Sequence, residues 1–206
     1  KNIYIPENAS ATTILSGYKQ LNSDSTNLKN KTKFNDIMTS NSLTGFFNNG
    51  VLDSLKLSGM ATTTYHVFED SLYKGKNEAS GDTIKMKFDN KELTNIYIKG
   101  GSMGEYTPDT ISNKLKYPLI YSAEKIDYYV TSEETELIGN AKVNHERTEL
   151  EAGYMKVNWP KKILNALPIN QDSIYKSINP KIIENSRNPM IGNEMIYNLE
   201  TKRGKI

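Results

Sequence analysis

The sequence predicts an all-β protein built from antiparallel hairpins that recur along the chain. Three observations support this prediction: a gapless internal repeat, short runs in which apolar and polar residues alternate, and a polar composition. The hydrophobic fraction is 36% and the mean hydropathy is -0.62. Such values are typical of half-buried strands with one wet face rather than of a deep globular core.

The repeat links two stretches of the chain without a gap. The stretch from Phe47 to Tyr65 matches the stretch from Phe88 to Tyr106 position by position. The matched pairs are Leu43 with Ile84, Phe47 with Phe88, Asn49 with Asn90, Leu52 with Leu93, Leu55 with Ile96, Leu57 with Ile98, Gly59 with Gly100 and Tyr65 with Tyr106. A fixed period of this kind indicates a stacked repeat architecture.

Residues 1–42 form a poorly defined N-terminal segment. Its part rich in Asn, Ser, Thr and Lys has a single apolar cluster, formed by Phe34, Ile37 and Met38. This pattern is compatible with first strands, with a short helix or with a loop. The sequence therefore leaves the secondary structure of this segment open.

Residues 43–166 carry the clear strand pattern. Ile84, Met86 and Phe88 alternate with lysines, residues 89–91 have the composition of a turn, and Ile96 and Ile98 alternate after it. This pattern predicts a hairpin with one apolar face.

Two further units, around turns at residues 131–135 and 160–162, repeat the pattern. Their alternating apolar residues are Ile126, Tyr128, Val130, Leu137, Val143, Met155, Val157 and Trp159.

The last part of the chain is less regular. Residues 167–189 contain Pro168, Pro180 and Pro189 and indicate an irregular connection. Residues 190–206 begin a further repeat that is truncated where its return strand is expected. Because the chain also starts with Lys1 rather than Met, we expect an excerpt from a longer protein or a chain whose leader has been removed.

The residues predict neither an enzyme nor a cofactor or metal site. Cysteine is absent from the sequence, which excludes disulfides and thiolate chemistry. His66 and His145 stand alone, without the spaced ligands of a metal site. Ser122 and Lys125 have the spacing of a nucleophile and its base, but the two motifs that accompany them in penicillin-recognising enzymes do not occur.

Charge and glycine content point away from nucleotides as well. The net charge is +2 and the charges are interspersed, whereas a nucleic-acid partner requires clustered Lys and Arg. Gly100, Gly101 and Gly104 are not followed by the Lys-Ser or Lys-Thr of a phosphate-binding loop. Glycines inside a strand pattern indicate a bulge or a bend instead.

A recurring form runs through these units. A small residue and an acidic or amide residue precede an alternating strand, a polar turn, a returning strand, and Gly-Asn-Ala or Gly-Gly-Ser. It occurs as GDTIKMKFDNKELTNIYIKGGSMGEY, AEKIDYYVTSEETELIGNAKV and GNEMIYNLETKRGKI. From about Leu43 onward the chain resembles the OstA-type β-jellyroll repeat of bacterial lipopolysaccharide-transport proteins. The closing stretch is most similar to the periplasmic N-terminal region of the LptD family.

This resemblance implies an elongated, open antiparallel β-jellyroll of stacked V-shaped hairpins. Its apolar interior would carry the acyl chains of lipopolysaccharide while the sugars stay in water. Gly59, Gly100 and Gly139 would lie where each arm bends so that the sheet folds over on itself. The residues expected on the inner, lipid-facing side are Ile84, Met86, Phe88, Ile96, Ile98, Ile126, Tyr128, Val130, Leu137, Val143, Met155, Val157 and Trp159.

The resemblance also implies partners and a location. It implies lipopolysaccharide as ligand, other β-jellyroll transport proteins joined by edge-strand addition, and the periplasm of a Gram-negative-type bacterium, at the periplasmic face of the outer membrane. The membrane itself would be reached through a barrel that these residues do not contain.

Two interpretations stay open at the level of sequence, a ligand groove and a sealed apolar core. Periodicity alone favours a sealed apolar core over a ligand groove, because most alternating faces in β-proteins are closed. A repetitive β structural or adhesive surface module with such a core is therefore the main alternative to a lipid carrier.

Overall fold

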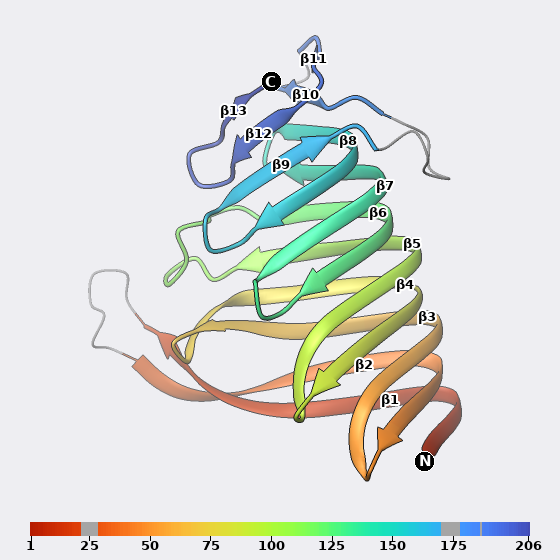
Figure 1. Cartoon of the computed structure of the whole chain (residues 1–206). Coiled ribbons are helices and arrows are strands. Elements are labelled where there is room, and N and C mark those ends of the chain that lie inside the picture. The colour runs from red at the N-terminus through yellow and green to blue at the C-terminus, as the bar shows by residue number, and fades with distance from the viewer. Residues whose placement is uncertain (22–28, 170–177, 186) are drawn as a thin grey trace.

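The computed structural model describes residues 1–21, 29–169, 178–185 and 187–206 (Figure 1). Among them it contains thirteen strands in one sheet. The strands are β1 (Asn2–Gln20), β2 (Lys29–Asn48), β3 (Val51–Glu69), β4 (Leu72–Asp89), β5 (Glu92–Pro108), β6 (Leu119–Tyr129), β7 (Glu134–His145), β8 (Thr148–Asn158), β9 (Ile163–Leu167), β10 (Lys181–Glu184), β11 (Met190–Ile191), β12 (Met195–Asn198) and β13 (Arg203–Lys205).

The strands follow one another as antiparallel neighbours from β1 to β9, and β12 and β13 continue the sheet beyond β9. The strand β8 has two different neighbours on its far side. Residues 154–158 of β8 pair with β9, and residues 148–151 pair with β10, which in turn pairs with β11. Figure 1 shows the strands stacked along one axis and curved into two layers, with the two chain ends at opposite ends of the stack. The predicted elongated antiparallel β-jellyroll is confirmed.

A bulge bends the sheet at the same level in every second strand. In β3, β5 and β7 the register shifts where two consecutive residues have positive φ: Gly59-Met60, Gly100-Gly101 and Gly139-Asn140. In β1 the shift lies at Glu7-Asn8, again with both φ values positive. Glycine adopts this conformation without steric cost, so its recurrence at these bulges follows from the backbone geometry.

The acidic or amide residue of the recurring sequence form packs against these bulges. A Cβ placed on Gly59 would lie 2.8 Å from Nδ2 of Asn41, and one on Gly100 would lie 2.3 Å from Oδ2 of Asp82. At the next bulge Asn140 donates a hydrogen bond to the carboxylate of Glu124. The bulge residues and the acidic or amide residue of the recurring form are therefore in contact on neighbouring strands at each bend.

The bends divide the sheet into two halves that face each other. We call the half that carries Leu57, Ile84 and Ile98 arm A, and the half that carries Ala79 and Tyr121 arm B. The hairpin tips of the two arms lie on the side away from the bends, so the sheet has the shape of a V.

A row of directly paired residues crosses arm A from β2 to β12, and each member is at most 5% exposed. In order across the sheet, the row consists of Leu43, Leu57, Ile84, Ile98, Ile126, Leu137, Met155, Ala166 and Met195. We call it the central row. Because side chains alternate between the faces of a strand, this register places the apolar set of each strand inside the V.

The two sequence repeats are equivalent in the structure. Phe47 pairs with Leu52 and Phe88 pairs with Leu93, and in both hairpins the register shifts immediately before the phenylalanine. Both phenylalanines therefore hold the same position in their units.

The N-terminal segment consists of the long strands β1 and β2. Phe34 and Met38 are buried there, whereas Ile37 is exposed. At the tip of arm B the end of β1 crosses to β4, where the Tyr18 N–H donates to the Ser71 carbonyl at 2.8 Å. The segment that the sequence left open thus belongs to the sheet.

Three details differ from the sequence expectations. The strand β6 ends at Tyr129, so Val130 lies in the following turn, where its N–H donates to the Thr94 carbonyl. The unit expected to be truncated has a short return strand, β13, paired with β12. The connection 167–189 contains β10; residues 170–177 and 186 of it lie outside the described part of the chain.

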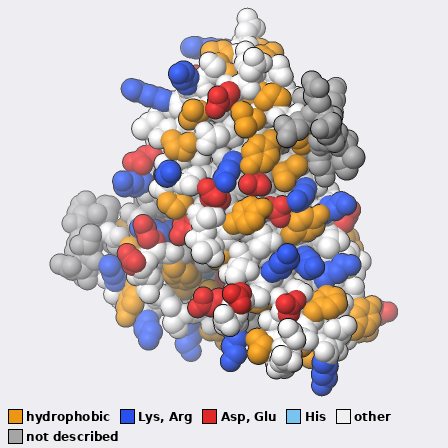
Figure 2. Space-filling model, in the orientation of Figure 1, with side chains coloured by type: hydrophobic (Ala, Val, Ile, Leu, Met, Phe, Trp, Pro, Cys, Tyr) orange, Lys and Arg blue, Asp and Glu red, His pale blue; other side chains and the backbone are white. Residues whose placement is uncertain are grey.

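The exposed surface is polar and mixed in charge. Figure 2 shows Lys and Arg side chains interspersed with Asp and Glu and with scattered hydrophobic ones on the visible face. In the described ranges no helix is long and apolar enough to cross a membrane.

Candidate functional site

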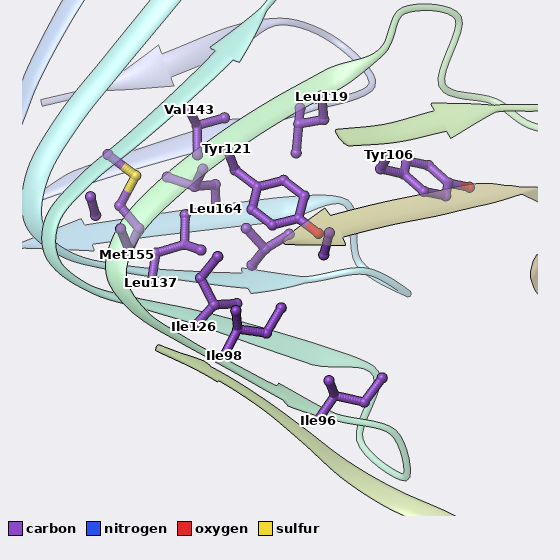
Figure 3. Close-up of a cluster of buried hydrophobic side chains, with 14 of the residues drawn as sticks. Ile96, Ile98, Tyr106, Leu119, Tyr121, Ile126, Leu137, Val143, Met155 and Leu164 are labelled. Carbon is purple, nitrogen blue, oxygen red and sulfur yellow. The ribbon is translucent and has the colours of Figure 1, made fainter. Parts of the chain in front are cut away.

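A cavity of about 390 Å³ lies between the two arms. Its volume falls within the range of about 300–1,000 Å³ that is common for small-molecule sites. Both arms and several hairpin tips contribute to its lining. Figure 3 shows the apolar interior around it, with side chains of β5, β6 and β7 pointing into the space between the two layers.

The wall on arm A is largely aliphatic. Ile96 and Ile98 of β5 and Ile126 and Tyr128 of β6 line the cavity, and Thr135 of β7 lies beside them. Ile96 pairs directly with Tyr128, and Ile98 with Ile126, so the four side chains form a compact patch on neighbouring strands. The alternation of each strand brings them to the same face.

The wall on arm B is richer in aromatic and polar groups. Tyr65, Asn77, Tyr106 and Tyr121 line it, together with Thr63, Val67 and Ala79.

Small residues of arm B make room for these rings. Ala79 pairs with Gly104, which pairs with Tyr121. A Cβ on Gly104 would lie 2.4 Å from the Tyr121 ring, so this ring lies flat over the glycine.

Aromatic pairs connect the arms across the interior. The rings of Tyr65 on arm B and Tyr128 on arm A are stacked, with 5.8 Å between their centroids. Tyr106 on arm B contacts Trp159, whose ring centroid is 5.1 Å away. The Trp159 indole N–H also donates to the Thr135 hydroxyl at 2.8 Å. These contacts fix the separation of the arms beside the cavity.

The hydroxyls of Tyr106 and Tyr121 are hydrogen-bonded to neighbouring groups of the chain. Tyr121 donates to the Asn77 side-chain oxygen at 2.7 Å, and Tyr106 donates to the Lys74 carbonyl at 3.1 Å while accepting from the Asn113 amide at 2.6 Å. Burial is the main cause that raises the pKa values of Tyr106 and Tyr121 above their usual range. The phenols therefore stay neutral at physiological pH, and the cavity wall carries no charge there.

The mouth of the cavity lies between the hairpin tips and is charged. Its basic residues are Lys74, Lys114, Lys161 and Lys162, and its acidic residues are Glu69, Glu133 and Glu200. Lys74 pairs with Glu69 at 3.0 Å, and Lys114 lies 4.0 Å from Glu200. The cavity therefore joins an apolar interior to a polar rim.

The residues expected on the inner face fall into three groups: those that line the cavity, those buried in the packed interior, and two that lie elsewhere. The residues of the first group, which line the cavity, are Ile96, Ile98, Ile126, Tyr128 and Trp159.

The second group is buried in the packed interior beside the cavity, and it consists of Ile84, Met86, Leu137, Val143, Met155 and Val157. The third group consists of Phe88, which is half-buried near the tip of arm A, and Val130, which lies in the turn after β6.

The sequence patterns did not identify the wall on arm B. The alternation of 61–69 and 102–108 is broken by polar and small residues, so the inner positions of these strands did not stand out. One signal was present, since Tyr65 and Tyr106 occupy the same position in the two repeats. In the structure both of these tyrosines face the cavity.

The histidines lie outside this site. His66 Nδ1 is 2.9 Å from the Asp36 carboxylate near the tip of arm B. His145 is buried beside Tyr197, and burial lowers its pKa. Within the described residues no group of three or more His, Cys, Asp and Glu side chains could hold a metal ion. The arrangement of the cavity suits the binding of an apolar chain.

Comparisons with known proteins bear on the fold. No protein-family model matches the chain, and no curated protein matches it. Among solved structures it is similar to the crystal structure of LptH, the LptA homologous periplasmic component of the conserved lipopolysaccharide transport device from Pseudomonas aeruginosa. The two chains share a fold. The TM-score is 0.57 at 17% sequence identity, over 72% of this chain and 93% of LptH.

Proposed function

We propose that this chain is a lipid carrier of the periplasm, which holds the acyl chains of lipopolysaccharide between its arms and passes the lipid toward the outer membrane. The observation that carries the proposal is the cavity between the arms, with its aliphatic patch on arm A. The fold shared with LptH, a component of a lipopolysaccharide transport device, supports the choice of ligand.

Burial of methylene groups supplies the binding energy in this proposal. Each methylene removed from water contributes about 0.8 kcal/mol, so one acyl chain against Ile96, Ile98 and Ile126 is held without any polar contact. No covalent step is needed, and the neutral phenols of arm B add no charge that would have to be desolvated.

Movement of the lipid requires the arms to separate. On both sides of the cavity the central row is closed, for example at Leu57 and at Leu137. The contacts that join the arms beside the cavity are aromatic pairs, each worth about 0.5–1.5 kcal/mol beyond area burial. This is a small amount compared with the stability of a domain, so opening at the cavity itself is accessible, whereas passage of the lipid past Leu57 or Leu137 also requires separation of the packed central row.

Edge strands supply the contact with partners. In the described residues the outer edge of β1 pairs with the rest of the chain only near Tyr18, which leaves most of its backbone groups free for strand addition. Ile3 and Ile5 lie on the inner face there and are exposed. Addition of a second jellyroll would cover them and continue the apolar interior. In its most specific form, the proposal is that this chain acts like the periplasmic region of LptD, which is linked to an outer-membrane barrel.

One observation favours the alternative of a structural or adhesive module. The central row is at most 5% exposed from Leu43 to Met195, so most of the interior is a packed core. A module of this kind would keep its arms closed and would bind no lipid.

The test is co-elution of fluorescent lipopolysaccharide with the chain in gel filtration. The variant Ile98→Asp places an unpaired charge in the wall of the cavity, and Lys99→Asp places the same charge on the outer face as a control. We expect binding by the native chain and by Lys99→Asp, and loss of binding by a folded Ile98→Asp variant. Absence of lipid from the native chain would favour the structural module.

A further inference from the structure

We propose that the cavity mouth is an anion site, in which Lys162 and Lys161 hold the phosphate or carboxylate head group of the lipid whose acyl chain lies inside. This inference rests on the proposed function and specifies its ligand as an anionic amphiphile. It starts from one side chain at the mouth, Lys162, and from the turn that positions it.

The turn between β8 and β9 fixes the backbone of Lys162. The Lys162 N–H donates to the Trp159 carbonyl at 3.2 Å, and the Lys162 carbonyl accepts from the Leu199 N–H at 2.8 Å. Its φ of 57° lies in the left-handed region, which non-glycine residues seldom occupy. The hydrogen bonds on both sides hold this conformation and direct the side chain to the lining of the cavity mouth.

The ammonium group of Lys162 has no counter-ion. The residue is half-buried, and in the described part of the chain no carboxylate lies within 4.0 Å of its Nζ. Burial lowers its pKa, and the more distant Glu69 and Glu133 oppose this only in part. A partly desolvated charge is costly until an opposite charge meets it.

The other mouth lysines show the contrast. Lys74 pairs with Glu69 at 3.0 Å and donates to the Ser112 carbonyl at 3.0 Å. Lys114 lies 4.0 Å from Glu200. Among the described residues, the mouth lysines without an ion pair are therefore Lys161 and Lys162, on one turn, and the mouth carboxylate without an ion pair is Glu133.

The same turn reaches the interior of the cavity. Trp159 lies three residues before Lys162 and packs on Tyr106, next to the place where an acyl chain would enter. A ligand with a chain in the cavity and an anionic group at its end would contact both parts of this turn. A neutral head group would leave the ammonium group of Lys162 without an ion-pair partner.

Trp159 is the single tryptophan of the sequence, so its fluorescence reports occupancy directly. We would titrate the chain with monododecyl phosphate, dodecanoate, dodecyl maltoside and inorganic phosphate, each below its micelle concentration. The variant Lys162→Gln removes the charge at the mouth. Lys99→Gln removes an exposed lysine of the outer face and serves as the matched control.

We expect both anionic amphiphiles to bind about tenfold more tightly than the maltoside, a difference that corresponds to one favourable charge contact. Lys162→Gln should abolish this preference, and Lys99→Gln should keep it. Equal binding of anionic and neutral amphiphiles by the native chain, or a preference that survives Lys162→Gln, would overturn the anion site.

The remaining outcomes separate this inference from the proposed function. If none of the amphiphiles binds, the acyl-chain cavity itself is wrong. If inorganic phosphate alone binds with the same dependence on Lys162, the site recognises a free anion and the assignment to a lipid head group is overturned.

Discussion

Tyr65 and Tyr128 stack across the interior of the V, one from each arm, with their ring centroids 5.8 Å apart. They lie far apart in the sequence and on strands that are not neighbours in the sheet. Together with Tyr106 and Trp159 they hold the arms together beside the cavity. Beside the cavity the separation of the arms therefore depends on these aromatic contacts, whereas packed aliphatic side chains fill the interior elsewhere.

This stack should be measurable as an energetic coupling. In a double-mutant cycle of Tyr65→Leu and Tyr128→Leu, the losses in unfolding free energy should fall short of additivity by about 0.5–1.5 kcal/mol. Urea unfolding of the four proteins supplies the values. Strictly additive losses would mean that the two rings do not support each other.

The buried phenols predict a loss of stability at alkaline pH. Burial raises the pKa values of Tyr65, Tyr106 and Tyr121, so the folded state keeps protons that the unfolded state releases at about pH 10. Their contribution is present below pH 10 and is lost as the pH rises further. Unfolding free energy measured between pH 8 and pH 12 should therefore fall steeply in the upper half of this range.

A pair of variants assigns this effect to the buried rings. Tyr106→Phe removes one such phenol and should flatten the alkaline slope, whereas Tyr4→Phe changes an exposed ring and should not. Identical slopes in the native chain and Tyr106→Phe would contradict the assignment.

The bulge in β5 predicts unequal costs for two adjacent glycines. Gly100 and Gly101 both have positive φ, so alanine at either position is strained by roughly 1–2 kcal/mol. At Gly100 the new Cβ would also meet Asp82, whereas at Gly101 no atom lies within 4 Å. Chemical denaturation should therefore show a larger loss for Gly100→Ala, by about 1–3 kcal/mol, than for Gly101→Ala. Equal losses would mean that the contact with Asp82 does not shape the bend.

The apolar interior should be closed in the middle and open at the β1 end. Leu57 is fully buried and pairs with Leu43. On the next strand Leu43 pairs with Ile5, which is 40% exposed. Leu57→Ala should cost about 2–5 kcal/mol in unfolding free energy, because it leaves a cavity. Ile5→Ala should cost less than about 1 kcal/mol in the isolated chain. Similar costs would indicate that the β1 end is already covered.

The fold was predictable because successive hairpins of the structure have matching sequences. The match of Phe47 to Phe88 and of Gly59 to Gly100 reflects equal positions in successive hairpins and bends. The sequence left the strands β1 and β2 open, since many of their residues are Asn and Lys, which have low β-propensity, and pairing with the rest of the sheet holds them as strands. Val130 was misplaced because apolar alternation continues into the turn.

The candidate site was predictable only on one arm. Alternation identifies Ile96 and Ile98 as inward-facing, but it does not distinguish a packed position from one that lines a cavity. That distinction depends on the size of the side chains that face these residues from arm B. Ala79 and Gly104 provide the room, and their contribution becomes visible only when arm B faces arm A.

The most direct test of the lipid-carrier account is photo-cross-linking at two adjacent tyrosines of β6. Tyr128 lines the cavity, whereas Tyr129 is 39% exposed on the opposite face. Each is replaced in turn by a photoreactive benzoylphenylalanine, and the folded proteins are irradiated with lipopolysaccharide. We expect a lipopolysaccharide adduct at position 128 and little or none at position 129. Equal labelling at both positions, or no adduct at position 128 in a folded protein, would contradict it.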